Sequence, residues 1–156
     1  KKLEILKDSH CGAFAVIRLC SYFLAYFALC TCVRFTPRVG VLWVLALVLE
    51  RALSGYAVAA FPMAKNTGLA HTFASAADKT TVRRVLAAAA AALCVGMVLL
   101  GGWALVLAAL AVLWRYHAVS QKQFGGITGD LAGWFLQKAE LWMLAALCIC
   151  QWGGLL

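Results

Sequence analysis

Charged residues are scarce in this sequence of 156 residues: they make up 13% of the chain, and only six of them are acidic. Soluble domains carry about a quarter charged residues, so this scarcity excludes an ordinary soluble domain. Proline occurs only twice and 65% of the residues are apolar, with a mean hydropathy of +0.89. The same composition excludes a disordered segment and a linker.

The sequence also lacks the side-chain patterns of common disulfide, zinc and hydrolase sites. Its seven cysteines are odd in number and lie mostly in apolar stretches, where cysteine behaves as a small hydrophobic residue. The pairs Cys30/Cys32 and Cys148/Cys150 have neither zinc-knuckle spacing nor a nearby histidine. No Ser/His/Asp or Cys/His constellation can be built on the dispersed histidines, which are His10, His71 and His117. We therefore expect neither disulfides nor a structural metal.

Long apolar blocks dominate the chain, at 12–33, 39–61, 85–119 and 131–150. One crossing of a bilayer needs about 20 residues, and the third block is nearly twice as long as that. The pair Gly101-Gly102 signals a turn, so we divide this block into 85–100 and 103–119. The predicted fold class is all-α, a polytopic transmembrane helix bundle of about five spans. Within it, the alanine run 87–92 predicts a close helix-packing surface.

Basic residues are concentrated on one side of this bundle. The N-terminal segment and the loops after the second and fourth spans hold nine of them: Lys1, Lys2, Lys7, Lys65, Lys79, Arg83, Arg84, Arg115 and Lys122. The opposite side holds two, Arg34 and Arg38. By the positive-inside rule we expect the nine to be cytoplasmic. The net charge of +8 then indicates contact with the lipid bilayer and not with nucleic acid. The polar residues share the basic side, so a site would open to the cytoplasm.

Two acidic residues near the N-terminus are candidates for metal binding. Glu4 and Asp8 are four residues apart, which places both carboxylates on one face of a helix. Such a pair can hold Mg²⁺, which proteins usually bind through one or two carboxylates together with substrate phosphates. The alternative is an interfacial helix with solvated charges, in which Asp8 or Ser9 caps the first span.

Glu50 and Arg51 lie near the middle of the second span, where an ionisable side chain costs several kcal/mol unless it is paired or hydrated. We expect both to face the interior of the bundle. They form either a structural interhelical pair or a site in which Arg51 receives an anionic group. Arg18 and Lys138 lie closer to the ends of their spans and are expected to extend to the interface.

A glycine-rich turn precedes the last span. It comprises Gly125, Gly126, Ile127, Thr128, Gly129 and Asp130. Glycines allow the backbone to approach a ligand closely, and amides and a hydroxyl at a helix N-terminus can receive phosphate oxygens. A bare turn with Asp130 as the N-cap explains the same residues.

Three segments taken together resemble the cobalamin (5'-phosphate) synthase family, also called adenosylcobinamide-GDP ribazoletransferases. Residues 3–9, LEILKDS, followed by Gly12, are similar to the family's LEIMKDS element. Residues 125–130, GGITGD, are similar to its GGxTGD element, which opens the final helix. Glu50-Arg51 with Gly55 lies between them in the expected order.

The resemblance implies a membrane transferase that joins adenosylcobinamide-GDP to α-ribazole or its 5'-phosphate, releases GMP and uses Mg²⁺. It implies that Glu4, Asp8 and Asp130 bind the metal or position the attacking hydroxyl. It assigns substrate binding to Lys7, Ser9, Arg51, Gly125, Gly126, Thr128 and Gly129. It also implies an integral protein of a bacterial or archaeal inner membrane, with the site facing the cytoplasm.

The chain departs from the family pattern in one respect. The family has an acidic motif of the form DGxxDxxDG upstream of the LEIMKDS element, and this chain has none. The first residue is also Lys and not Met. We therefore expect residues 1–156 to form a single transmembrane domain that is the C-terminal part of a longer enzyme. The alternatives are that a second chain supplies the missing half or that the protein is inactive.

Two other functions are compatible with the sequence. One is a non-enzymatic membrane subunit, such as a transporter component or an assembly partner, in which Glu50 and Arg51 form the interhelical pair. The other is a different alcohol phosphotransferase, such as a phospholipid synthase, which shares the chemistry but carries its own multi-Asp motif. That motif is missing as well, so the corrinoid transferase is the leading hypothesis.

Overall fold

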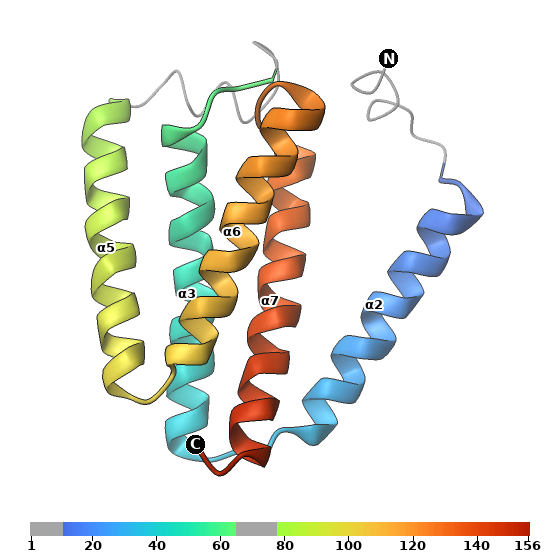
Figure 1. Ribbon diagram of the computed structural model, residues 1–156, viewed down its shortest axis with the longest axis vertical. Coiled ribbons are helices and arrows are strands. Elements are labelled where there is room, and N and C mark those ends of the chain that lie inside the picture. The colour runs from blue at the N-terminus through green and yellow to red at the C-terminus, as the bar shows by residue number, and fades with distance from the viewer. Residues whose placement is uncertain (1–10, 65–77) are drawn as a thin grey trace.

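The computed structural model describes residues 11–64 and 78–156, and these form five long helices (Figure 1). The helices are α2 (Ala13–Cys32), α3 (Pro37–Ala60), α5 (Lys79–Leu99), α6 (Trp103–Phe124) and α7 (Gly129–Trp152). Each is long and apolar enough to cross a membrane. The predicted all-α bundle of five spans is confirmed, including the division of the long third block at Gly101-Gly102.

Short polar segments determine where the helices begin. Thr36 caps α3, its Oγ1 accepting from the Val39 amide at 3.3 Å, and Pro37 occupies the first helical position. Proline is favoured there because that amide has no partner inside the helix. Thr128 caps α7 in the same way. Side-chain caps of this kind satisfy amides that the first turn of a helix leaves unpaired.

Asp78 caps α5 and lies outside the spans. Its carboxylate accepts from the Thr81 hydroxyl at 2.6 Å and from the Thr80 amide at 3.1 Å. These hydrogen bonds, the one from Thr81 first, hold the pKa of Asp78 below its usual range. Because the pKa is lowered, the ionised Asp78 cap stabilises the helix fully at pH values above the ordinary pKa of aspartate. This stabilisation is lost as the pH falls through the lowered pKa.

The five described helices alternate in direction along the bundle (Figure 1). The beginning of α2, the end of α3, the beginning of α5 and the α6–α7 turn all lie at one end. The α2–α3 and α5–α6 connections and the C-terminus lie at the other end. The described basic residues predicted to be cytoplasmic therefore share one half of the bundle, whereas Arg34 and Arg38 lie at the opposite end.

The packed core lies among α3, α5, α6 and α7. Tyr116 of α6 and Phe135 of α7 are fully buried and stack with ring centroids 5.3 Å apart. Gly55 of α3 allows close contact with Leu86 of α5, since a Cβ at this glycine would lie 3.0 Å from the leucine side chain. The predicted packing surface at 87–92 is wrong for most of the run, because only Ala90 is buried.

Helix α2 stands apart from this core. It has no buried residue, it packs chiefly against α7, and its first half leans away from the bundle (Figure 1). Contacts near its last turn fix it: the Cys148 thiol donates to the Leu29 carbonyl at 3.4 Å. Just beyond that turn, the Gln151 side-chain amide exchanges two hydrogen bonds with the backbone of Arg34. Most of the surface of α2 is therefore exposed, including Phe14, Phe23 and Phe27.

Candidate functional site

The glycine-rich turn between α6 and α7 is fixed by backbone pairing with the segment that follows α3. The Ile127 amide donates to the Pro62 carbonyl, and the Ala64 amide donates to the Ile127 carbonyl, both at 2.9 Å. Met63 and Ile127 thus form an isolated parallel β-bridge. These two hydrogen bonds hold together segments more than 60 residues apart in the sequence, at the end of the bundle where the candidate site was predicted.

Two glycines make this pairing possible, each for a different reason. Gly125 ends α6 in the left-handed conformation, with φ of 71°, which is the usual role of a glycine after a helix. Gly126 is buried, and a Cβ there would lie 2.5–2.6 Å from backbone atoms of Pro62, Met63 and Ala64. The close approach at Gly126 is to the chain's own backbone, and the approach to a ligand predicted for these glycines stays a prediction.

The hydroxyl and the carboxylate of the turn have different surroundings. Thr128 is buried, and its Oγ1 accepts from the Leu131 amide, so Thr128 and not Asp130 is the N-cap of α7. The alternative of Asp130 as the cap is thus wrong. Asp130 lies in the first turn of α7 with an exposed side chain. A carboxylate in that position is free to meet a ligand at this end of the bundle.

We predict that Gly126→Ala destabilises the turn, because the added Cβ collides with backbone and both hydrogen bonds to the 62–64 segment must lengthen. The expected loss in the free energy of unfolding is about 2 kcal/mol, at about 1 kcal/mol for each bond. Denaturant titration in detergent measures it. Gly133→Ala is the matched control, because a Cβ there meets nothing within 4 Å. An equal effect of the two substitutions would contradict the packing role of Gly126.

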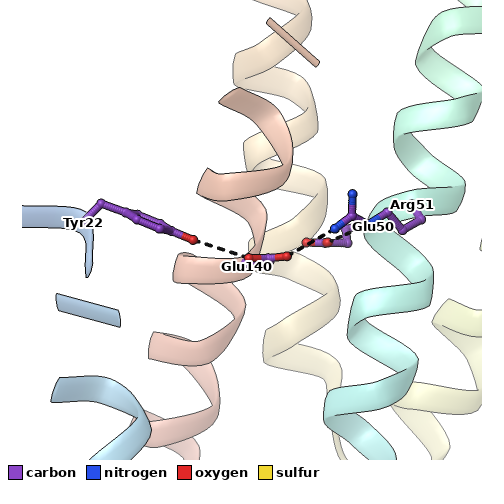
Figure 2. Close-up of polar contacts among 4 residues, drawn as sticks. All are labelled: Tyr22, Glu50, Arg51 and Glu140. Carbon is purple, nitrogen blue, oxygen red and sulfur yellow. Dashed lines mark hydrogen bonds and ion pairs between the residues drawn. The ribbon is translucent and has the colours of Figure 1, made fainter. Parts of the chain in front are cut away.

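A second polar group lies inside the spans and links three helices (Figure 2). The Arg51 guanidinium on α3 lies 3.4 Å from its neighbour Glu50 and 3.6 Å from Glu140 on α7. The Tyr22 hydroxyl on α2 donates to the other oxygen of Glu140 at 3.4 Å. Ionisable groups within a bilayer normally pair with one another in this way, because water is not available to solvate them.

The expectation that Glu50 and Arg51 both face the interior is half correct. Glu50 is fully buried, but 63% of the Arg51 side chain is exposed. Adjacent residues on a helix point about 100° apart, so both cannot face the same neighbours. The Arg51 side chain still reaches the two carboxylates because it is long, and its outer surface remains open.

Glu140 and Tyr22 are the members of this cluster that the sequence analysis missed. Glu140 is the second carboxylate placed deep within a span, so the rule that singled out Glu50 applies to it equally. Tyr22 gave no such signal, since a tyrosine within an apolar span is common. Its role depends on how α2 meets α7, which the sequence alone does not specify.

We predict that Arg51→Met lowers the free energy of unfolding by about 1–3 kcal/mol. The value is smaller than for a fully buried pair because Arg51 is partly exposed. The double variant Arg51→Met/Glu50→Gln should recover at least half of the loss, since it leaves no unpaired buried carboxylate. Reversible unfolding in detergent measures both, with the exposed Arg84→Met on α5 as control. Additive losses in the double variant would show that the pair is not coupled.

The structure brings together only part of the predicted site. Gly125, Gly126, Thr128, Gly129 and Asp130 are contiguous at one end of the bundle. Arg51 lies nine residues before the end of α3, about 14 Å deeper along the helix axis. The remaining predicted residues, Glu4, Lys7, Asp8 and Ser9, lie outside the described residues.

The metal-binding prediction rests on residues that are mostly outside the described part of the chain. Among residues 11–64 and 78–156, no group of three or more His, Cys, Asp or Glu side chains could hold a metal ion. Asp130 is the one predicted ligand whose position is known. A single exposed carboxylate is compatible with Mg²⁺, which takes few protein ligands when phosphates supply the others. The roles predicted for Gly126 and Thr128 in binding also stay predictions.

Comparison with known proteins places these features in context. The model of the cobalamin-5-phosphate synthase family matches residues 1–148. The adenosylcobinamide-GDP ribazoletransferase of Lachnoclostridium phytofermentans is 40% identical over 154 residues, which cover 97% of this chain and 58% of the relative. The protein of the same name from Roseiflexus is 34% identical and covers 96% and 54%. No solved structure matches the chain.

Another protein of that name, from Pseudomonas savastanoi pv. phaseolicola, is 32% identical and covers 96% of this chain and 60% of the relative. The chain thus spans a little under two thirds of the length of the curated relatives it matches. The match of the family model nevertheless covers nearly all of its residues, and it includes both the segment before α2 and the turn before α7. The family resemblance predicted from three short segments is confirmed, and the chain belongs to the cobalamin-5-phosphate synthase family.

Proposed function

We propose that this chain is part of a membrane transferase that joins adenosylcobinamide-GDP to α-ribazole or its 5'-phosphate and releases GMP. This is the step that assembles the nucleotide loop of cobalamin. The observation that carries the proposal is the family match over residues 1–148. The exposed Asp130 beside a rigid glycine-rich turn supports it, because this is a suitable place for phosphate chemistry.

The reaction is a phosphoryl transfer. A hydroxyl of α-ribazole attacks the phosphorus that carries the cobinamide alcohol, and the bond from this phosphorus to the bridging oxygen breaks, so that GMP leaves. The hydroxyl proton must pass to a base. Catalysis then requires an oriented hydroxyl, bound phosphates and compensation of negative charge. Asp130 is proposed to accept the proton or to position the hydroxyl, together with Asp8 and Glu4.

Phosphate binding is proposed to come from the turn and from basic residues. Gly125 and Gly129 are exposed, so their backbone is open to a ligand. Arg51 can use the donors that Glu50 and Glu140 leave unused, since a guanidinium has five N–H groups and only one side is occupied by the carboxylates. Lys7 and Ser9 complete the proposed set. The part of the family's length that this chain lacks, on the same or on another chain, is proposed to supply further acidic residues.

Mg²⁺ is the proposed metal. Glu4, Asp8 and Asp130 would hold it, since hard carboxylate oxygens suit this ion. When bound, the ion would neutralise phosphate charge and favour departure of GMP. The exposed carboxylate of Asp130 fits such a role, because no described residue forms an ion pair with it that would have to be broken first.

We expect Asp130→Asn, made in the protein with its native N-terminus, to lower the turnover number at least about a hundredfold, because the amide cannot take a proton or bind a metal equally well. The amount of inserted protein should not change. Release of GMP in membranes measures the activity. Asp78→Asn is the matched control, because asparagine caps a helix as well as aspartate does. Normal turnover in the Asp130 variant would refute its proposed role.

The site is proposed to face the cytoplasm of the inner membrane. The described basic residues at the site's end of the bundle support this orientation under the positive-inside rule. In a cysteine-free background, Lys122→Cys at the end of α6 should be labelled by an impermeant maleimide only in inverted vesicles. Thr36→Cys, at the opposite end, should be labelled only in intact cells. The reverse pattern would overturn the orientation.

A further inference from the structure

A cleft on the surface of α6 and α7 is not used by the proposed reaction. Its volume is about 590 Å³, and eight of the described residues line it: Arg18, Ala108, Ala111, Val112, Arg115, Trp134, Lys138 and Trp142. Among these described lining residues, three are basic, two are tryptophans and none is acidic. The basic residues come from three different helices, α2, α6 and α7.

The spacing of the lining residues explains the shape of the cleft. On α6 the contributing positions follow the i, i+3, i+4, i+7 pattern from 108 to 115, and on α7 they are four residues apart from 134 to 142. Each helix therefore presents a single stripe to the cleft. Ala108 and Ala111 are small and leave a hollow, whereas Trp134 and Trp142 are large and form a wall. The cleft follows from regular helix geometry and not from a distorted loop.

The three cations lie within the spans, on the side of the membrane proposed to be cytoplasmic. Arg115 and Lys138 are each nine residues from the nearer end of their helix, about 14 Å along the axis, and Arg18 is five residues in, about 8 Å. No carboxylate of the described residues forms an ion pair with any of them. Glu140 is two positions from Lys138, but it is engaged with Tyr22 and Arg51 on another side of α7.

Three positive charges that share one cleft need an anion. They repel one another, and solvation by water is poor at this depth, so an unoccupied cleft is costly. Long side chains can extend toward the interface, where the phosphates of lipids lie. The rest of the lining, which is alanine, valine and tryptophan, suits hydrocarbon. A ligand that fits both parts has an anionic phosphate at one end and a hydrocarbon chain at the other.

We propose that this cleft binds an anionic phospholipid, with the phosphodiester between Arg18, Arg115 and Lys138 and an acyl chain along Ala108, Val112 and Trp142. The inference does not depend on the proposed transferase reaction, since none of these residues belongs to the site described above. A soluble phosphate compound offers the same charge but lacks the hydrocarbon. The apolar lining favours the lipid.

The experiment is a lipid titration of the protein with its native N-terminus, delipidated in detergent and followed by native mass spectrometry. The probes are dioleoylphosphatidylglycerol, which is anionic, and dioleoylphosphatidylcholine, which is neutral overall. Arg115→Gln/Lys138→Gln removes two charges from the cleft. Arg83→Gln/Arg84→Gln removes two charges from the same end of the bundle, on α5 and outside the cleft, and is the matched control.

The expected result is a preference for the anionic lipid that the cleft variant loses and the control retains. Each basic residue near an anionic lipid accounts for about a fivefold change in dissociation constant, so the double variant should weaken binding about 30-fold. Arg115→Lys/Lys138→Arg preserves the charges and should bind like the wild type. If the double variant does not fold, the single variants Arg115→Gln and Lys138→Gln should each weaken binding about fivefold.

Three results would overturn the proposal. The first is unchanged binding of phosphatidylglycerol to the folded cleft variants, and the second is equal affinity of the wild type for both lipids. The third is displacement of bound phosphatidylglycerol by inorganic pyrophosphate, which would assign the cleft to a soluble phosphate compound. A parallel assay of GMP release distinguishes failure of the lipid proposal from failure of the transferase proposal. If the activity is absent while lipid binding is intact, only the transferase proposal is contradicted.

Discussion

Charges within a bilayer must find partners in the protein or in the lipid, because water is not available to solvate them. This constraint accounts for the contacts of α2, α3 and α7 in the middle of the bundle. Arg51 lies between Glu50 and Glu140, and Glu140 in turn accepts a hydrogen bond from Tyr22. One chain of polar contacts therefore joins the three helices α2, α3 and α7. The contacts specify which helices are neighbours, a choice that apolar packing in lipid leaves largely open.

The two ends of the bundle differ in how their connecting segments are arranged. At the end where Lys122 and Asp130 lie, backbone segments of two loops pair with each other, and the turn before α7 is held in one conformation. At the other end the connections are short and lie close to the helices they join. The basic cleft lies within the spans and not in these loops, because its described lining residues belong to α2, α6 and α7.

The helices could be predicted from the sequence because hydrophobic length and the Gly101-Gly102 turn are local signals. Boundaries shifted by a few residues where polar side chains continue a helix, as at Lys79 and Phe124. The polar contacts were predicted less well, because they depend on which helices meet. The sequence predicts that Gly126 approaches a ligand, whereas the contact that the structure shows is with the chain's own 62–64 backbone. The sequence predicts Arg18 and Lys138 separately as interfacial residues, and only the packing of α2 beside α7 places them in one cleft.

The position of α2 has a consequence for how the protein is made. This helix precedes the other four in the chain, yet the described contacts that fix it, from Cys148, Glu140 and Gln151, all come from α7, the last helix. During synthesis α2 therefore enters the membrane long before its partner exists. Its many exposed apolar side chains allow it to remain in lipid during that interval. The described contacts of α2 can therefore form only after α7 has been synthesised.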